Sequence, residues 1–148
     1  MPNNIYLPKP GRIAHIKTEV EGNRAIKTFQ VTFADGDGFE HACGQCAMLS
    51  VFGKGEMMIS IASSPLIEDY KQFSVMRVGR VTSALHDLEV GDVIGVRGPY
   101  GNDFPVEAWQ GKNLVLIGGG CGLAPIWPVV QTVVARRADF GAITVFYG

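Results

Sequence analysis

The chain changes its pattern of hydrophobic and polar positions once, near residue 110. From Gly11 to about Val106, short alternating or apolar stretches are separated by glycine-rich turns. The alternation over 28–33 and the turn at 35–38 are typical of antiparallel β structure. Strands are predicted at Arg12–Thr18, Ala25–Phe33, Ala47–Phe52, Met58–Ala62, Phe73–Val78 and Val93–Arg97. Five or six strands at this spacing predict a small closed barrel or a sandwich.

One short helix is predicted within this β-rich part. Thr82 is a suitable N-cap for a helix over Ser83–Leu88, and Gly91 then turns the chain toward the next strand. The barrel core is expected to contain Leu49, Val51, Phe52, Met57 and Met58.

After residue 112 the pattern becomes that of one β-α-β unit. An apolar strand ends at Ile117, a helix follows from about Ala124 to Arg137, and a second apolar strand covers Ile143–Tyr147. Residues 1–108 and 112–148 are therefore predicted to be separate domains. Both strands are apolar throughout, as parallel strands covered on two faces are. The second domain is thus expected to be incomplete, its remainder removed or supplied by another chain.

Composition excludes several classes of partner. Hydrophobic residues make up 47% of the 148 residues, and the net charge of −1 leaves no basic surface for nucleic acid or an anionic membrane. No stretch approaches the roughly 18 apolar residues of a membrane span, and the N-terminus lacks signal-peptide features. A cytoplasmic protein is expected. Three cysteines, an odd number, disfavour a disulfide framework.

The most informative motif is the glycine loop of residues 118–125. An apolar strand leads into four glycines within five positions and then into a helix whose start is marked by Pro125. Backbone N–H groups in such a loop can hold a pyrophosphate at the helix N-terminus. The loop is not the dinucleotide fingerprint, because Pro125 stands where the third glycine would be. A tight turn without a ligand is the alternative.

Two further motifs point to a flat, phosphate-bearing ligand. Gly79–Thr82 joins a strand to a helix and could hold a second pyrophosphate, with Arg77 or Arg80 neutralising its charge. An ordinary helix cap is the simpler alternative for that tetrapeptide. Ser60–Pro65 places small residues where a flat ring could lie against backbone, although for this segment alone a strand ending in a Ser-Pro turn is the favoured interpretation.

The cysteine pair Cys43 and Cys46 forms a lone C-x-x-C motif. Thiol redox chemistry or half of a zinc site is conceivable, but metal sites usually need a second pair of ligands close by. Structural thiols are favoured and no metal site is predicted. No Ser-His-Asp, Cys-His or paired-carboxylate arrangement supports hydrolysis.

Taken in order, the turns of the chain resemble the ferredoxin–NADP reductase superfamily, and within it the sulfhydrogenase gamma and anaerobic sulfite reductase B type. The matching segments are Tyr6–Pro10, 44–45, 53–56, Ile59–Ser63, 79–85, 91–92, 98–105 and Gly118–Pro125. The resemblance implies an all-β, six-stranded antiparallel Greek-key barrel that binds FAD. It further implies that the β-α-β unit opens an α/β domain that binds NAD(P)H.

The resemblance also implies site residues. Ser60 corresponds to the catalytic serine beside the flavin ring. FAD would be held by Ile59, Ser60, Ile61, Ala62, Ser63, Arg77, Gly79, Arg80, Val81 and Thr82. NAD(P) would be held by Gly118, Gly119, Gly120, Gly122, Leu123, Ala124 and Pro125.

The chain departs from the superfamily pattern at two places. Met57 and Ile59 stand where the superfamily has an arginine and a tyrosine, so one phosphate-binding guanidinium and one stacking ring are missing. Cys43 and Cys46 stand where it has proline and phenylalanine, which favours reading them as packing substitutions.

The first functional hypothesis is an FAD-dependent NAD(P)H oxidoreductase subunit. It would pass electrons between NAD(P)H, FAD and an iron–sulfur, hydrogenase or sulfite-reductase-type partner. A [2Fe–2S] centre would lie only in sequence beyond Gly148, and the 148 residues alone are expected to keep FAD without turning over NAD(P)H. The alternatives are a non-catalytic assembly module with weak or absent flavin and, ranked last, thiol redox chemistry at Cys43 and Cys46.

Overall fold

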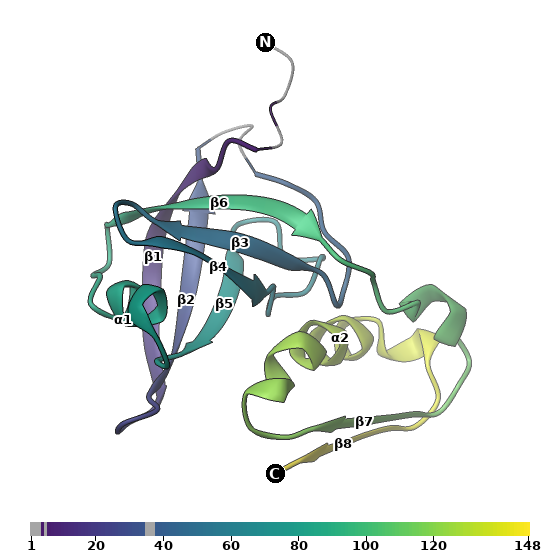
Figure 1. Cartoon of the computed structure of the whole chain (residues 1–148). Coiled ribbons are helices and arrows are strands. Elements are labelled where there is room, and N and C mark those ends of the chain that lie inside the picture. Colours follow the sequence, from purple (N-terminus) through teal and green to yellow (C-terminus); the bar gives the residue numbers. More distant parts are fainter. Residues whose placement is uncertain (1–3, 5, 35–37) are drawn as a thin grey trace.

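A computed structural model describes Asn4, residues 6–34 and residues 38–148 of the chain. A β-barrel forms the N-terminal part, and a small α/β unit follows it (Figure 1). The predicted turn at 35–38 lies largely outside the described residues. Within the described residues, no helix is long and apolar enough to cross a membrane.

Six antiparallel strands build the barrel. They are β1 (Lys9–Val20), β2 (Ile26–Phe33), β3 (Cys46–Val51), β4 (Gly55–Ser60), β5 (Lys71–Met76) and β6 (Val93–Tyr100). Their order in the sheet is β4-β3-β6-β1-β2-β5, and every hydrogen-bonded pair is antiparallel. Just beyond β4, the Ala62 N–H donates to the Gln72 carbonyl in β5 at 2.7 Å. This bond joins the two edges of the sheet. The antiparallel pairing of all six strands confirms the predicted antiparallel β structure.

The position of β4 differs from the prediction. The strand begins at Gly55 and ends at Ser60, whereas the sequence pattern placed it over Met58–Ala62. Gly53 has a φ of +74° and Gly55 one of +135°, so the β3–β4 hairpin turns within this glycine pair and pairing starts at once. Residues 61–64 consequently leave the strand and run toward the α/β unit.

The barrel core is made of the inward-facing residues of all these strands except β4, with contributions from flanking segments. Its buried members are Ile13, Phe29, Val31, Ala47, Leu49, Val51, Ile61, Phe73, Val75, Leu85, Ile94 and Val96. Met57 packs against this cluster, as predicted. The prediction was wrong for Phe52 and Met58, which are each 60% exposed. Phe52 follows the end of β3, and Met58 alternates with the inward-facing Met57.

The short helix α1 (Arg80–His86) starts three residues earlier than predicted, with Gly79 as its N-cap. Thr82 is the third helical residue rather than the cap. Its hydroxyl accepts the N–H groups of Val78 and Gly79 at 3.0 and 2.9 Å, so the side chain reaches back to stabilise the helix start from within. At the other end, His86 is buried, and burial lowers its pKa.

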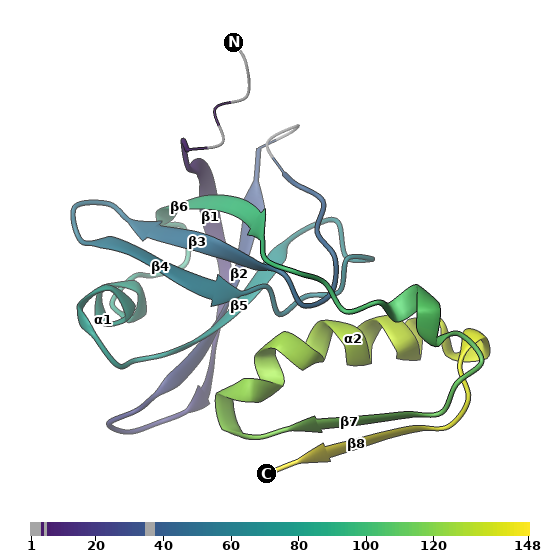
Figure 2. The same cartoon turned by 45° about the vertical axis from the view of Figure 1, so that its right-hand side comes forward.

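The C-terminal part is the predicted β-α-β unit. Strands β7 (Leu114–Gly118) and β8 (Ile143–Tyr147) pair in parallel, and helix α2 (Leu123–Ala135) connects them. Short 3₁₀ turns cover Val106–Trp109, Gly120–Gly122 and Arg137–Asp139. Helix α2 lies between the barrel and the β7–β8 pair (Figure 2).

Only one face of the β7–β8 pair is covered in this structure. Leu114, Leu116 and Ile143 pack with Val129 and Val133 of α2. On the opposite face of the pair, Val115 and Ile117 of β7 are 61% and 69% exposed. The apolar strand pattern therefore predicted the parallel pairing correctly, while cover on both faces stays a prediction.

Buried polar contacts dock α2 onto the barrel. The Thr132 hydroxyl donates to the Pro128 carbonyl at 2.7 Å and therefore accepts the hydrogen of the Ser64 hydroxyl, also at 2.7 Å. The side-chain carbonyl of the preceding residue, Gln131, accepts the Ser64 N–H at 2.8 Å. The Cys43 thiol lies 3.4 Å from the same Thr132 oxygen. These contacts hold the segment after β4 against the middle of α2.

Thr132→Val is expected to lower the free energy of unfolding by about 1–3 kcal/mol, because the nearly isosteric side chain leaves the buried Ser64 hydroxyl without its partner. Urea unfolding followed by circular dichroism measures this difference. The matched control is Thr144→Val on the exposed part of β8, which is expected to change stability by about 0.5 kcal/mol or less. Equal effects of the two variants would contradict the docking role of Thr132.

Candidate cofactor-binding site

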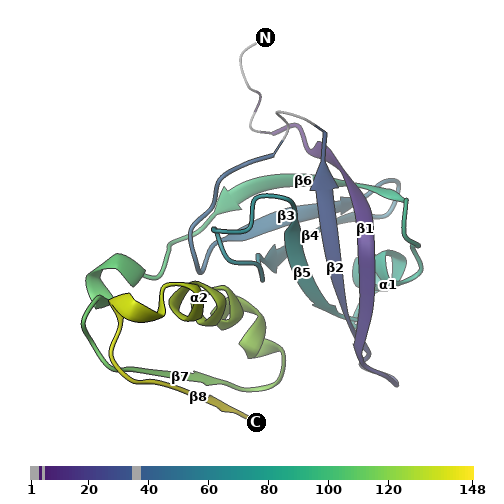
Figure 3. The same ribbon diagram turned by 180° about the vertical axis from the view of Figure 1, so that it is seen from behind.

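A cleft separates the outer face of the barrel from the start of α2. It holds a cavity of about 580 Å³ lined by outward-facing residues of β1, β2 and β5, by the glycine loop and by the first turns of α2. Figure 3 shows β1, β2 and β5 on the side of the barrel turned toward the viewer, with α2 below the barrel. The contacts of Ser64 with Gln131 and Thr132 set the width of this cleft, because they fasten the barrel to α2 at one end of it.

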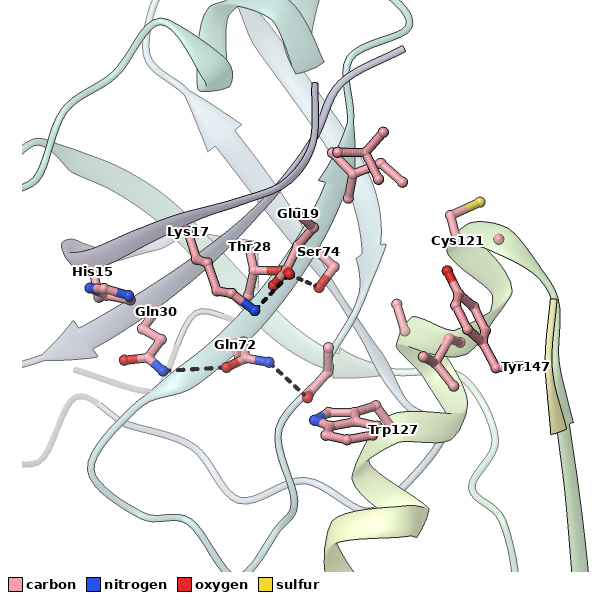
Figure 4. A pocket seen from close by; sticks show the side chains of 16 residues that line it. His15, Lys17, Glu19, Thr28, Gln30, Gln72, Ser74, Cys121, Trp127 and Tyr147 are labelled. Carbon is pink, nitrogen blue, oxygen red and sulfur yellow. Dashed lines mark hydrogen bonds and ion pairs between the residues drawn. The ribbon is translucent and has the colours of Figure 1, made fainter. Parts of the chain in front are cut away.

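The barrel wall of the cavity carries hydrogen-bonding side chains. Antiparallel pairing places Thr28 opposite Ser74 and Gln30 opposite Gln72. The two hydroxyls lie 2.8 Å apart, and the Gln30 amide donates to the Gln72 amide oxygen at 3.3 Å. Gln72 in turn donates to the Ala62 carbonyl at 3.4 Å (Figure 4). The β2–β5 part of the wall is therefore an ordered array of neutral donors and acceptors, beside which β1 adds the Lys17–Glu19 ion pair.

The facing wall is mainly apolar. Leu123, Ala124 and Trp127 contribute from α2, and Tyr147 contributes from the end of β8 (Figure 4). A space with one hydrogen-bonding wall and one apolar or aromatic wall suits a flat heteroaromatic ring, whose faces are apolar and whose edges are polar.

A second cavity, of about 410 Å³, lies at the far end of β5. Arg24, Arg77 and Gly79 line it. The first cavity reaches Ile26, which pairs with Met76 of β5. Arg77, the residue directly after β5, donates its N–H to the Ala25 carbonyl at 2.8 Å and lines the second cavity. The two cavities therefore adjoin along the β2–β5 pair. A Cβ atom built on Gly79 meets no heavy atom within 4 Å, so the backbone there faces open space. Two guanidinium groups beside open backbone suit a pyrophosphate.

The structure brings only Ala62 of the predicted flavin-ring segment to the first cavity. The side chains of Ile61 and Ser63 are fully buried, and the Ser63 hydroxyl accepts the Gln72 N–H at 3.1 Å. Their side chains therefore support the wall from behind, and their role in holding a flavin stays a prediction. Ile59 packs against the barrel core, and Ser60 is half-buried opposite Cys46 without lining either cavity.

The segment predicted to hold the pyrophosphate, residues 77–82, also lies only partly at a cavity. Arg77 and Gly79 line the second cavity, but Arg80, Val81 and Thr82 are not among its lining residues. Val81 packs against the barrel core, and the Thr82 hydroxyl is occupied by the helix start. Arg77 also pairs with Asp87, at 3.1 Å, which keeps its guanidinium near the cavity.

The glycine loop presents fewer free N–H groups than its sequence suggests. The Gly120 N–H donates to the Gly148 carbonyl and the Gly122 N–H to the Gly119 carbonyl, both at 2.8 Å. A Cβ atom on Gly118 would lie 3.1 Å from the Leu123 Cα, so this glycine permits close packing of strand and helix.

The loop nevertheless opens onto the first cavity. Gly120, Leu123 and Ala124 line it, whereas Gly118, Gly119, Gly122 and Pro125 do not. Gly120 has a φ of +51°, a left-handed conformation that glycine adopts without strain. The fold therefore places the loop opposite β5, although a nucleotide there stays a prediction.

The thiols of the C-x-x-C motif have separate environments. Cys43 is buried beside Thr132, and burial raises the pKa of its thiol; Cys46 donates its S–H to the Tyr100 carbonyl at 3.4 Å. All three cysteines are free, and Cys121 lines the first cavity. No group of three or more metal-ligating side chains occurs within residues 6–34 and 38–148. The packing interpretation of Cys43 and Cys46 agrees with these contacts.

Sequence comparison finds relatives among subunits of sulfhydrogenases and of dihydroorotate dehydrogenase B. The chain is 44% identical over 151 residues to sulfhydrogenase 1 subunit gamma of Pyrococcus furiosus, an alignment covering 97% of this chain and 52% of that protein. It is 37% identical over 148 residues to sulfhydrogenase 2 subunit gamma of the same organism, covering 98% and 50%. The probable dihydroorotate dehydrogenase B (NAD(+)) electron transfer subunit of Methanocaldococcus jannaschii is 40% identical over 120 residues, covering 80% and 41%.

Solved structures share the fold at low sequence identity. The ferredoxin–NADP+ reductase from Plasmodium falciparum superposes with a TM-score of 0.78 at 19% identity, covering 95% of this chain and 58% of that one. The flavohem-like FAD/NAD binding domain of nitric oxide dioxygenase from Vibrio cholerae gives 0.77 at 23% identity, covering 95% and 62%.

The chain is a homologue of the sulfhydrogenase gamma subunits and has the ferredoxin–NADP+ reductase fold. The resemblance inferred from the order of the turns is thereby confirmed. The chain spans about half the length of the relatives it matches in sequence. No model of a known protein family matches it.

Sequence reasoning missed the residues that shape the first cavity most. Gln72 and Ser74 alternate with buried residues along β5, so a polar outer face could have been read there. A place for Trp127 in the cavity is harder to predict from the sequence, because a tryptophan on an amphipathic helix is more often part of the core. Tyr147 reaches the cavity only because β8 ends beside the glycine loop.

Gly120→Ala is expected to lower the free energy of unfolding by about 1–2 kcal/mol, because alanine is disfavoured in the left-handed conformation. Gly122→Ala is the matched control, since Gly122 has a φ of −67° and a Cβ there meets no atom within 4 Å. Chemical unfolding of both variants measures the difference. A Gly120→Ala variant as stable as Gly122→Ala would show that the loop adopts another conformation.

Proposed function

We propose that the chain is the FAD-binding and nicotinamide-facing part of an electron-transfer subunit. The observation that carries the proposal is the pair of adjoining cavities along β2 and β5. One offers a hydrogen-bonding wall facing an apolar wall, and the other offers two arginines beside an open glycine. A flavin ring joined to a pyrophosphate requires this sequence of environments.

Bound FAD would supply the redox chemistry, because a flavin can accept a hydride from NAD(P)H and release electrons singly to another centre. The residues of this chain would supply placement. Gln72 and Ser74 would hydrogen-bond the ring edge, and Arg77 would hold the pyrophosphate. The glycine loop, through Gly120 and Ala124, would bring the nicotinamide nucleotide to the same cavity. A catalytic role for Ser60 stays a prediction.

The partner proposed is an iron–sulfur or hydrogenase-type subunit. The support comes from the relatives, which are named as subunits of sulfhydrogenases and as electron transfer subunits of dihydroorotate dehydrogenase B. A cytoplasmic location, a [2Fe–2S] centre beyond Gly148 and the inability of these 148 residues to turn over NAD(P)H also stay predictions.

The deciding experiment is uptake of FAD. Purified chain mixed with FAD and freed of unbound cofactor by gel filtration is expected to keep absorption bands near ~370 and ~450 nm, as flavoproteins generally do. Protein that emerges colourless would overturn the proposal. That result would favour the non-catalytic assembly module, to which Met57 and Ile59 also point, since both pack on the barrel core and line neither cavity.

Arg77→Gln is expected to weaken FAD binding about tenfold, because a charge-assisted hydrogen bond to phosphate is lost and solvent screens part of its strength. Titration of the flavin absorbance measures the dissociation constant. Arg80→Gln is the matched control, since Arg80 lies next to the second cavity in sequence without lining it, and its affinity should stay within about threefold of the original. Equal losses in both variants would contradict the placement of the pyrophosphate.

A further inference from the structure

Trp127 is a large aromatic residue that the fold leaves partly open to the first cavity. It is 38% exposed and lines the cavity from α2, near Gln72 on the polar wall of β5 (Figure 4). Its sequence neighbour Pro128 is buried, so the helix itself is well packed at this point. The exposure therefore belongs to the side chain and not to a loose helix end.

The position of Trp127 is set by the docking of the two parts of the chain. Gln131 lies one helical turn beyond Trp127 and so on the same face of α2. Its side chain accepts the Ser64 N–H at 2.8 Å. This contact anchors that face of the helix to the segment following β4, and Trp127 is thereby held on the side of α2 that faces the barrel.

The barrel wall opposite Trp127 is largely polar. Thr28 and Ser74 bond to each other, Gln30 bonds to Gln72, and Lys17 pairs with Glu19 at 2.7 Å. These groups satisfy one another and present polar edges. The exposed indole and the hydrogen-bonding wall are complementary to the face and the edge of one planar ring.

We propose that Trp127 is a flavin-binding residue whose indole lies against the ring of bound FAD while β5 holds the ring edge. This assignment rests on the proposed function. It places the aromatic surface for the ring on α2 and not on β4, where Ile59 packs into the barrel core. The α/β unit would then contribute directly to holding the flavin as well as the nicotinamide nucleotide.

The test uses the fluorescence and affinity of bound FAD. An indole in contact with a flavin quenches flavin emission, so wild-type protein should bind FAD with strongly quenched emission. Trp127→Leu should raise the emission of bound FAD several-fold and weaken binding about tenfold, as expected for loss of an aromatic stacking contact. Trp127→Phe should keep the affinity within about threefold while also raising the emission.

Trp109→Phe is the matched control, because Trp109 is the other of the two tryptophans and packs against the second core near Phe104. It should leave both emission and affinity unchanged. Melting curves of each variant confirm that it is folded. If wild-type protein takes up no FAD, the proposed function fails, and this assignment with it. If wild-type and Trp127→Leu proteins bind FAD with equal affinity and equal emission, the assignment alone is overturned.

Discussion

The structure depends most on the polar contact between the barrel and the middle of α2. Ser64 reaches Thr132 through its hydroxyl and Gln131 through its N–H, at 2.7 and 2.8 Å, in surroundings that exclude water. A buried hydroxyl without its partner is costly, so the two parts can dock in only a narrow range of positions. The width of the cleft and the residues that face each other across it follow from this one contact.

The outer face of β2 and β5 explains how one small barrel can offer two different environments. Residues alternate along β5, so Phe73 and Val75 fill the core while Gln72 and Ser74 face the cleft. The same strand then leads into Arg77 at the second cavity. A ligand with a flat polar-edged ring at one end and phosphates at the other can follow this strand over its whole length.

The chain keeps the fold of its relatives while changing individual contacts. Met57 and Ile59 stand where the superfamily resemblance implies an arginine and a tyrosine, and the structure packs both against the barrel core. The groups that line the cavities in their place, Arg24 and Trp127, come from the β1–β2 turn and from α2. In the proposed FAD site the arginine and the aromatic ring thus come from other elements than in the superfamily pattern, while the strand order is that of the shared fold.

Local features of the sequence determined much of this protein. Alternation along the strands, the glycine turns and the two apolar strands around one helix predicted the antiparallel barrel and the β-α-β unit, because each is a short-range property of neighbouring residues. The tertiary structure alone decided which residues meet in the cleft. Ile61 and Ser63 look suited to a ring in sequence, yet both are fully buried, while Ala62 between them lines the first cavity. Trp127 faces β5 only because α2 docks through a contact that joins residues 68 positions apart, and no local pattern encodes such a contact.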